Sequence, residues 1–309
     1  MFALKPITIL FLLSCLTCFS GCKTTESVIP YEENGKYGFV SRSGSVRIPA
    51  IYSSYNQIRN PGYIVVSKEK KWGVIDFRGN TVIDFVHDYI SDVFYDGMIL
   101  VKNNGAYGYA DVHGKLVIPC IYENWFWFTD KLAEVKKGGK SGIINMRGET
   151  VIPFEYDNLF VSTSENLFGA SKNGKWGFID KQNNVVIPFI YTEAFAFSEG
   201  LALVRSHDFK YGYINRANDT VIPFIYEWPN FCDWQSAAFK NGRAEVRKDN
   251  RSGYINKKGE AVIPLKYYCI KGFYDGLAAV RVDNGEKLYS NEHKTIQYGY
   301  VDVNGKEYL

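Results

Sequence analysis

Hydrophobic and polar residues alternate in short runs along most of the chain, and turn residues separate the runs. In residues 201–226 the runs are LALVR, KYGYIN and TVIPFIY. Alternation with a period of two predicts β-strands, and Asn-Gly pairs between such runs predict antiparallel hairpins. Beyond the N-terminal segment, no stretch shows a sustained period of 3.6 apolar residues. We therefore expect an all-β chain built from three-stranded antiparallel meanders.

A glycine marks the middle strand of each meander, between an aromatic residue or serine and a hydrophobic pair. The steps between successive glycines are 35, 35, 34, 35, 35, 41 and 46 residues. A fixed period of this length is the signature of a repeat architecture. We predict a tandem array of about eight repeats, arranged as a propeller-like ring or an open superhelical stack. The repeats are numbered 1 to 8 by these glycines: Gly38, Gly73, Gly108, Gly142, Gly177, Gly212, Gly253 and Gly299.

Two more positions recur in each repeat. Six residues after the marker glycine stands a glycine or asparagine, the residues that enter the left-handed backbone region at least cost. This predicts a tight turn at that position in all eight repeats. Eleven residues after the marker, six repeats carry a proline, which suits an edge strand or a bulge because it lacks an N–H. These prolines are Pro49, Pro119, Pro153, Pro188, Pro223 and Pro264, and repeat 2 has Asp84 instead.

Both faces of the third strand are apolar. In repeat 6, Val221 and Ile225 point to one face, whereas Ile222, Phe224 and Tyr226 point to the other. We therefore expect this strand to be buried on both sides between neighbouring repeats. The marker glycine is expected to let an aromatic ring of a neighbouring repeat cross the strand closely.

The first 21 residues have the features of a cleaved export signal. Lys5 is followed by the apolar run 7–13, which is shorter than the ~20 residues that a transmembrane helix needs. Gly21-Cys22 then resembles the lipobox of bacterial lipoproteins, which predicts acylation of Cys22 and a tether over residues 22–30. The array follows over residues 31–309. An ordinary signal peptide with incidental cysteines is the alternative, and Cys15 is a second candidate for acylation.

Composition and charge exclude several classes of protein. The chain is 46% hydrophobic, which is enough to form a core and argues against disorder. Subtracting 33 acidic from 36 basic residues gives a net charge of +3 without a basic block, so nucleic acid is not expected as a partner. Four scattered histidines offer little material for a metal centre. We expect no metal and no cofactor.

Catalytic motifs are missing from the sequence, so we do not expect an enzyme. Residues 137–141 (KGGKS) resemble a phosphate-binding loop, but they align with the hairpin turn of the next repeat. His87 and Asp84 lie three residues apart on one strand and therefore point to opposite faces. Three cysteines remain in the mature chain, which permits at most one intramolecular disulfide. Cys232–Cys269 is one such pairing, whereas Cys120 occupies an apolar position of its repeat.

Aromatic residues make up 16% of the chain, and most of them follow the repeat. Those that do not follow it are the candidate binding surface, because longer connections in repeat proteins often form the binding face. Packing between neighbouring sheets is the alternative role. These residues are Trp228, Phe231 and Trp234 in the connection over residues 227–242, together with Trp125 and Trp127 before repeat 4.

The marker motif resembles that of the WG-repeat family of bacterial proteins, which is named for the pair kept here at Trp72-Gly73 and Trp176-Gly177. The resemblance covers residues 31–309 and implies a β-rich scaffold, without naming a ligand. We expect a non-catalytic, lipid-anchored scaffold that binds an unknown protein at the cell envelope, on the outer membrane or cell surface of a Gram-negative source. A glycan or cell-wall binding module is the alternative, and an envelope enzyme is the third.

Overall fold

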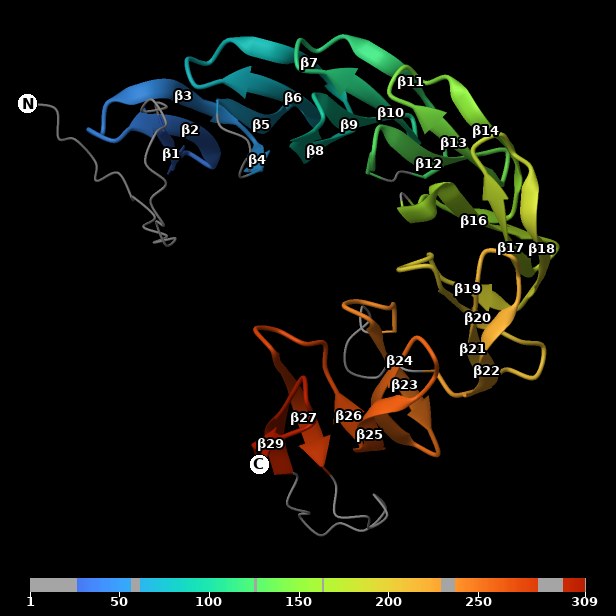
Figure 1. The fold of residues 1–309 in the computed structure, drawn as a ribbon. Coiled ribbons are helices and arrows are strands. Elements are labelled where there is room, and N and C mark those ends of the chain that lie inside the picture. Colours follow the sequence, from blue (N-terminus) through green and yellow to red (C-terminus); the bar gives the residue numbers. More distant parts are fainter. Residues whose placement is uncertain are drawn as a thin grey trace, which may run out of the picture. The chain divides into compact units, whose positions relative to one another are not determined.

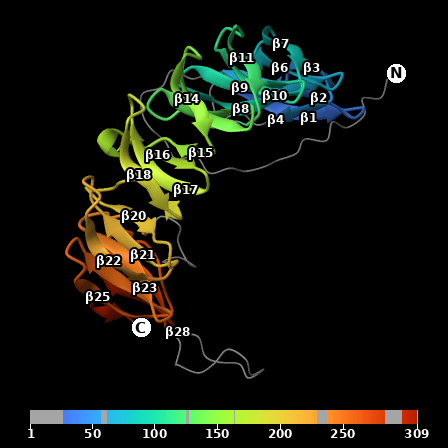
Figure 2. The ribbon, with the colours of Figure 1, turned by 90° about the vertical axis from the view of Figure 1, so that its right-hand side faces the viewer.

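The computed structural model describes residues 27–56, 62–124, 127–162, 164–228, 237–282 and 297–308. Within these residues the regular structure is β-strand, apart from one short 3-10 turn, η1 (Ser164–Asn166). The chain divides into two compact units, Met1–Thr150 and Val151–Leu309. Each repeat forms its own antiparallel sheet, and the strands of a sheet follow one another in chain order (Figures 1 and 2). The prediction of an all-β array of eight repeats is confirmed.

The N-terminal unit holds repeats 1 to 3 and the first two strands of repeat 4, because the boundary between the units falls at Thr150. The strands of repeats 1 and 2 are β1 (Val28–Glu33), β2 (Lys36–Ser41), β3 (Val46–Tyr52), β4 (Ser54–Asn56), β5 (Tyr63–Lys68), β6 (Lys71–Asp76) and β7 (Thr81–His87). The strands of repeats 3 and 4 are β8 (Tyr89–Tyr95), β9 (Met98–Asn103), β10 (Ala106–Asp111), β11 (Leu116–Tyr122), β12 (Leu132–Lys137), β13 (Lys140–Asn145) and β14 (Thr150–Tyr156).

The C-terminal unit holds repeats 5 to 8. The strands of repeats 5 and 6 are β15 (Asn158–Phe160), β16 (Leu167–Lys172), β17 (Lys175–Asp180), β18 (Val185–Tyr191), β19 (Glu193–Ala194), β20 (Ala202–Arg205), β21 (Tyr211–Ile214) and β22 (Thr220–Tyr226). The strands of repeats 7 and 8 are β23 (Arg243–Lys248), β24 (Arg251–Asn256), β25 (Ala261–Tyr267), β26 (Cys269–Ile270), β27 (Leu277–Val282), β28 (Gln297–Asp302) and β29 (Glu307–Tyr308).

Five of the eight sheets have a fourth strand, which the three-stranded prediction missed. These strands are β4, β8, β15, β19 and β26, and each precedes the first predicted strand of its repeat. Strand β15 has only three residues and pairs Phe160 with Gly169. The Phe160 ring lies directly over this glycine, because a methyl group added to Gly169 would fall 1.9 Å from Cζ of the ring. A run this short carries no detectable alternation.

Local turn chemistry explains how each meander reverses direction. In repeat 5, Asn173 and Gly174 have φ values of 54° and 71° and join β16 to β17, as the Asn-Gly signal predicts. The predicted second turn is also present. Its glycines have φ values from 76° to 89°, and the two asparagines that replace glycine, Asn183 and Asn218, have values of 66° and 68°.

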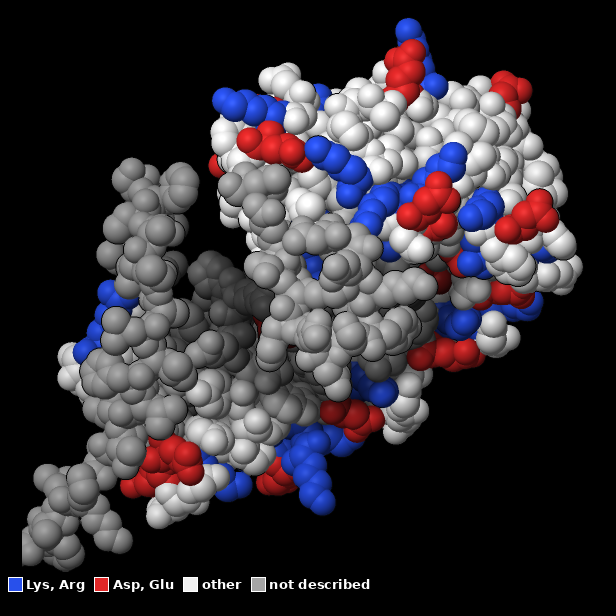
Figure 3. Space-filling view, turned by 90° about the horizontal axis from the view of Figure 1, so that it is seen from below, with Lys and Arg blue, Asp and Glu red and all other residues white. Residues whose placement is uncertain are grey.

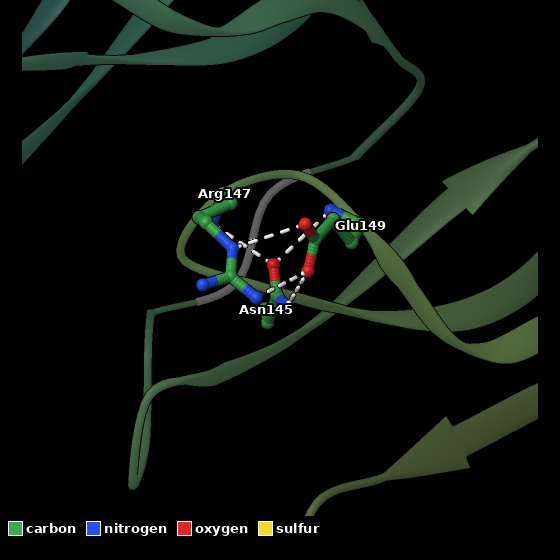
Figure 4. Close-up of polar contacts among 3 residues, drawn as sticks. All are labelled: Asn145, Arg147 and Glu149. Atoms are coloured by element: carbon green, nitrogen blue, oxygen red, sulfur yellow. Dashed lines mark hydrogen bonds and ion pairs between the residues drawn. The ribbon is translucent and has the colours of Figure 1, made fainter.

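The second turn closes around the side chain that ends the middle strand (Figure 4). In repeat 4, Asn145 Oδ1 accepts hydrogen bonds from the backbone N–H groups of Arg147 at 2.9 Å and Glu149 at 3.1 Å. Glu149 also forms an ion pair with Arg147 at 2.7 Å. A side chain that satisfies two backbone donors fixes the turn without help from distant residues.

The marker glycine makes close contact with its own repeat, and not with a ring of a neighbour. A methyl group added to Gly177 would lie 2.5 Å from the carbonyl oxygen of Ile187 and 2.8 Å from Pro188. The cause is a bulge in β18, since Trp176 pairs with Tyr191 while Phe178 pairs with Ile187. The extra residues at the proline push the backbone over the glycine. The expectation of a crossing ring from a neighbouring repeat was therefore wrong.

The third strand is buried on one face only, contrary to the expectation from its apolar pattern. In β22, Ile222 and Tyr226 are buried, whereas Val221 and Ile225 are exposed. This strand lies at the edge of its sheet, and the face that carries Val221 and Ile225 meets solvent. Its β-branched residues on that face reflect strand propensity and not burial. The middle strand is the one buried on both faces, because Tyr213 and Ile214 of β21 are both buried although they point to opposite faces.

Candidate functional site

Trp228 lies at the junction of repeats 6 and 7. It follows β22 directly after Glu227, whose backbone forms a bridge with Arg247 of β23. The indole packs against Phe195 and Tyr211, with ring centroids 5.3 Å apart in each pair. Trp228 also packs against the core that residues of repeats 6 and 7 form together, so it takes part in packing between repeats, which is one of the two roles that the sequence left open.

A polar group adjoins this aromatic contact. The Tyr211 hydroxyl donates a hydrogen bond of 2.5 Å to Glu193, and the other Glu193 oxygen forms an ion pair with Arg205 at 2.8 Å. Arg205 also donates to the Thr192 hydroxyl at 2.9 Å. Burial, followed by the Glu193 carboxylate, raises the pKa of Tyr211. The phenol therefore stays protonated at neutral pH and acts as a donor.

Phe209 stands at the tip of the hairpin between β20 and β21, next to this polar group. It is 67% exposed and has a φ value of 59°, a region that bulky side chains rarely occupy. The Arg205 guanidinium lies over its ring, 5.1 Å from the centroid. The backbone of Phe209 is therefore strained while its ring is exposed to solvent. Backbone strain of this kind is concentrated at functional sites.

We name Phe209, Arg205, Tyr211, Glu193 and Trp228 the Phe209 cluster. Its charged and polar groups are paired with one another, so none of them is set up as a nucleophile or a general base. Its exposed part is an aromatic ring with a guanidinium over one face. An arrangement of this kind can form a contact surface, because exposed aromatic and arginine side chains carry much of the binding energy in interfaces.

Trp127 lies in the N-terminal unit, where its indole packs against the Tyr95 ring at an interplanar angle of 37°, with ring centroids 4.4 Å apart. The next residue, Phe128, is buried and packs against Tyr109 at 4.9 Å. Successive side chains of an extended segment alternate between faces, so Trp127 is half-buried at the surface while Phe128 enters the core. Of the remaining predicted residues, Trp125, Phe231, Trp234 and the acylation candidate Cys22 lie outside the described residues.

The two cysteines that the structure describes differ in state. Cys120 is free and half-buried, and burial raises the pKa of its thiol. It is therefore a packed apolar side chain and not a reactive thiolate. Cys269 is disulfide-bonded, whereas Cys232, its predicted partner, lies outside the described residues.

The other sequence features show no catalytic geometry. Residues 137–141 form a hairpin turn, in which Lys137 pairs with Lys140. His87 is buried while Asp84 is exposed, so the two do not form a pair. In the described part of the chain, no group of three or more His, Cys, Asp or Glu residues could hold a metal ion. On the face drawn in Figure 3, acidic and basic side chains are interspersed.

Sequence reasoning missed a set of phenylalanines that join the repeats. Each lies two residues before an acidic or asparagine turn residue, as in FTDKL, FSEGL, FKNGR and FYDGL. Each packs against the middle-strand aromatic of the preceding repeat. The pairs are Phe128 with Tyr109, Phe197 with Phe178 and Phe239 with Tyr213, each at 4.9 Å, and Phe273 with Tyr254 at 5.0 Å. The recurrence of this motif was the signal that could have found them.

The WG containing repeat matches this chain seven times, over residues 37–72, 72–105, 107–140, 142–176, 176–208, 211–251 and 253–285. No curated protein sequence matches the chain.

Several solved structures are similar in fold at low identity. A eukaryotic initiation factor is 8% identical, with 93% of this chain and 86% of that chain covered and a TM-score of 0.49. BamB from Moraxella catarrhalis is 11% identical, with 88% and 94% covered and a TM-score of 0.39. The computationally designed Ika8 protein is 11% identical, with 83% and 85% covered and a TM-score of 0.41. None of these likenesses is close enough to say more about this chain.

Proposed function

Because the chain belongs to the WG-repeat family, we propose that it is an exported, lipid-anchored and non-catalytic scaffold that binds another protein at the cell envelope. The contact surface is the Phe209 cluster, whose exposed ring lies on the hairpin between β20 and β21 of repeat 6. An exposed aromatic ring of this kind is an anchor that protein interfaces use. The exposed Phe209 ring, held at a strained φ over Arg205, is the observation that carries the proposal.

Two features support export. The N-terminal sequence has a cation, a short apolar run and Gly21-Cys22 in the order of a lipoprotein signal. Cys269 is disulfide-bonded, and disulfides persist in oxidising compartments outside the cytosol. In the part of the chain that the structure describes, no helix has the length and hydropathy to cross a bilayer. An acyl group on Cys22 would supply the membrane attachment, on the outer membrane or cell surface of a Gram-negative source.

A captured partner tests this proposal. Full-length protein is retrieved from membranes of its own cells, and the co-purifying proteins of wild type, Phe209→Ser and Tyr274→Ser are compared. Tyr274 is the matched control because it is also an exposed aromatic residue at a turn. We expect one partner to be retained by wild type and Tyr274→Ser, and lost with Phe209→Ser. Equal retention by Phe209→Ser would remove this cluster as the contact surface.

Glycan binding is the second candidate, and the contact between the rings of Tyr95 and Trp127 is the observation that favours it. Tyr95 is exposed, and its ring and the indole form a platform of the kind on which sugar rings can stack. Purified envelope polysaccharide is the probe. Retention by wild type and loss with Tyr95→Ala would support a glycan site, whereas no retention by wild type would exclude it.

A further inference from the structure

Repeat 3 contains a pocket of ≈ 420 Å³ beside the hairpin between β9 and β10. Its lining residues are Asp88, Tyr89, Lys102, Gly105 and Tyr107. A volume of this size is within the range of pockets that bind small molecules. The pocket shares no residue with the Phe209 cluster or with the pair of rings proposed above to bind glycan, so it is a separate candidate site.

The strand register places three of the lining side chains in one row. Lys102 of β9 pairs with Tyr89 of β8 and with Tyr107 of β10. Side chains of directly paired residues lie on the same face of a sheet, so the lysine lies between the two tyrosines. Lys102 Nζ is 4.7 Å from the centroid of the Tyr107 ring. Tyr89 is exposed, which opens the row to solvent.

Repeat 6 has the same row, with a carboxylate in it. Arg205 pairs with Glu193 and with Tyr211 in the same register. Glu193 thus stands at the position of Tyr89, and Arg205 corresponds to Lys102. The Glu193 carboxylate forms an ion pair of 2.8 Å with Arg205 and accepts a hydrogen bond of 2.5 Å from the Tyr211 hydroxyl. A cation paired with a tyrosine at these two positions therefore binds a carboxylate.

Repeat 3 does not supply a carboxylate to its own cation. Asp88 is the one acidic residue among the described residues of the pocket, and both of its oxygens have other partners. One forms an ion pair of 2.5 Å with Lys71, and the other accepts a hydrogen bond of 2.7 Å from the backbone N–H of Asn104. In the part of the chain that the structure describes, no acidic side chain lies within ion-pair distance of Lys102.

We propose that this pocket binds the carboxylate of a hexuronate, a six-carbon sugar acid. The carboxylate takes the position that Glu193 has in repeat 6, with the Lys102 ammonium and the Tyr107 hydroxyl as its donors. The sugar ring lies against the exposed ring of Tyr89. Asp88 accepts hydrogen bonds from sugar hydroxyls, whereas its negative charge opposes a dianion such as a phosphate.

The probe is D-galacturonate, titrated into full-length protein in a detergent without a sugar head group and followed by ligand-observed saturation-transfer NMR. We expect a dissociation constant on the order of 1 mM, which is typical of a ligand of about 13 non-hydrogen atoms. Galactose lacks the carboxylate and should bind at least ~tenfold more weakly, because hydrogen bonds to charged groups are the stronger ones. Acetate lacks the ring and should also bind more weakly.

Two variants place the ligand in the pocket. Tyr89→Glu copies the row of repeat 6, so the new carboxylate should occupy the site and abolish galacturonate binding. Tyr89→Gln also lacks the ring but adds no charge, so it should retain more binding than Tyr89→Glu. Lys102→Gln should lose binding. Its matched control is Lys136→Gln, because Lys136 has the same position in repeat 4 but pairs with Ser141 and not with a tyrosine.

The outcomes separate this site from the other proposals. Phe209→Ser and Tyr95→Ala should bind galacturonate as wild type does, so failure of either earlier proposal leaves this one intact. Equal melting temperatures show that the pocket variants are folded. Equal affinity for galactose or acetate would overturn the proposal, as would binding by Lys102→Gln at the wild-type level. The absence of saturation transfer to galacturonate with wild type, well above the expected dissociation constant, would also overturn it.

Discussion

The hydroxyl of Tyr156 donates a hydrogen bond of 2.7 Å to Asn183 Oδ1, joining the third strand of repeat 4 to the second turn of repeat 5. Tyr191 and Asn218 form the same bond at the same distance one repeat later. In both places asparagine stands where the other repeats have glycine. The asparagine thus serves two purposes, since it tolerates the left-handed backbone and also supplies an acceptor for the preceding repeat.

Removing the hydroxyl tests this link. Tyr156→Phe should lower the free energy of unfolding by about 1 kcal/mol, the typical net value of a hydrogen bond. Tyr52→Phe is the matched control, because the turn after Tyr52 contains Gly79 and so offers no side-chain acceptor. Urea unfolding followed by tryptophan fluorescence measures both. Losses of equal size would show that the hydroxyl–asparagine bond contributes nothing of its own.

The sequence predicts turns well, because they depend on a few neighbouring residues. It predicts contacts between paired strands poorly. Asn173-Gly174 and the turn at Asn183 are set by the conformational preferences of single residues, so they were predicted correctly. The bulge at Pro188 brings Ile187 over Gly177, and this contact depends on the register between two strands. Alternation does not report the extra residues of a bulge, so the close neighbour of Gly177 was predicted wrongly.

The candidate site was harder to predict because it does not follow the repeat. Residues that recur can be identified by aligning the repeats, but no other repeat has a tryptophan at the position of Trp228. The contact of Trp228 with Phe195 arises only in the folded chain. Phe209 was missed for a related reason. Its hairpin has no Asn-Gly signal, and a strained φ cannot be read from composition.

Adding a side chain at the bulge should destabilise the fold. Gly177→Ala places a methyl group 2.5 Å from the Ile187 carbonyl oxygen, so the strands must separate at a cost of about 1–3 kcal/mol, as for overpacking elsewhere. Gly174→Asn is the control, since that position has open space and asparagine accepts its φ of 71°. Thermal and urea unfolding should separate the two variants clearly. Wild-type stability in Gly177→Ala would contradict the close contact.

Acid should weaken the junction around His87. This residue is 6% exposed, whereas other repeats have tyrosine in its place. Burial lowers the pKa of His87, and nearby Lys71 acts in the same direction, although Asn103, Asp88 and Asp84 oppose the shift. The folded protein therefore holds the neutral ring, while the unfolded chain takes up a proton near the ordinary value of 6.5. Stability is full above that pH and falls as the pH drops below it.

His87→Tyr restores the residue of the other repeats and removes the titration. We expect the melting temperature of wild type to fall more than that of His87→Tyr between pH 8 and pH 5. Carboxylates elsewhere titrate in both proteins and cancel in the comparison. Parallel melting curves at every pH would rule out this role for His87.

In repeat 4, a glutamate and a serine occupy the positions of a leucine and a tyrosine in repeat 3. Ser141 donates a hydrogen bond of 2.9 Å to Glu134, and both side chains are buried. Repeat 3 has Leu100 and Tyr107 at the same two positions. The two positions are thus filled either by leucine with tyrosine or by glutamate with serine. The glutamate needs the serine because a buried carboxylate requires a hydrogen-bonding partner.

A double-mutant cycle tests this exchange. Ser141→Tyr alone should destabilise the protein by about 1–3 kcal/mol, because the ring overfills the space and the Glu134 carboxylate loses its donor. Glu134→Leu with Ser141→Tyr restores the pair of repeat 3, so the double variant should be more stable than Ser141→Tyr alone. Urea unfolding of the four proteins gives the coupling free energy between the two positions. Additive effects would show that the two positions are independent and that the serine is not tied to the glutamate.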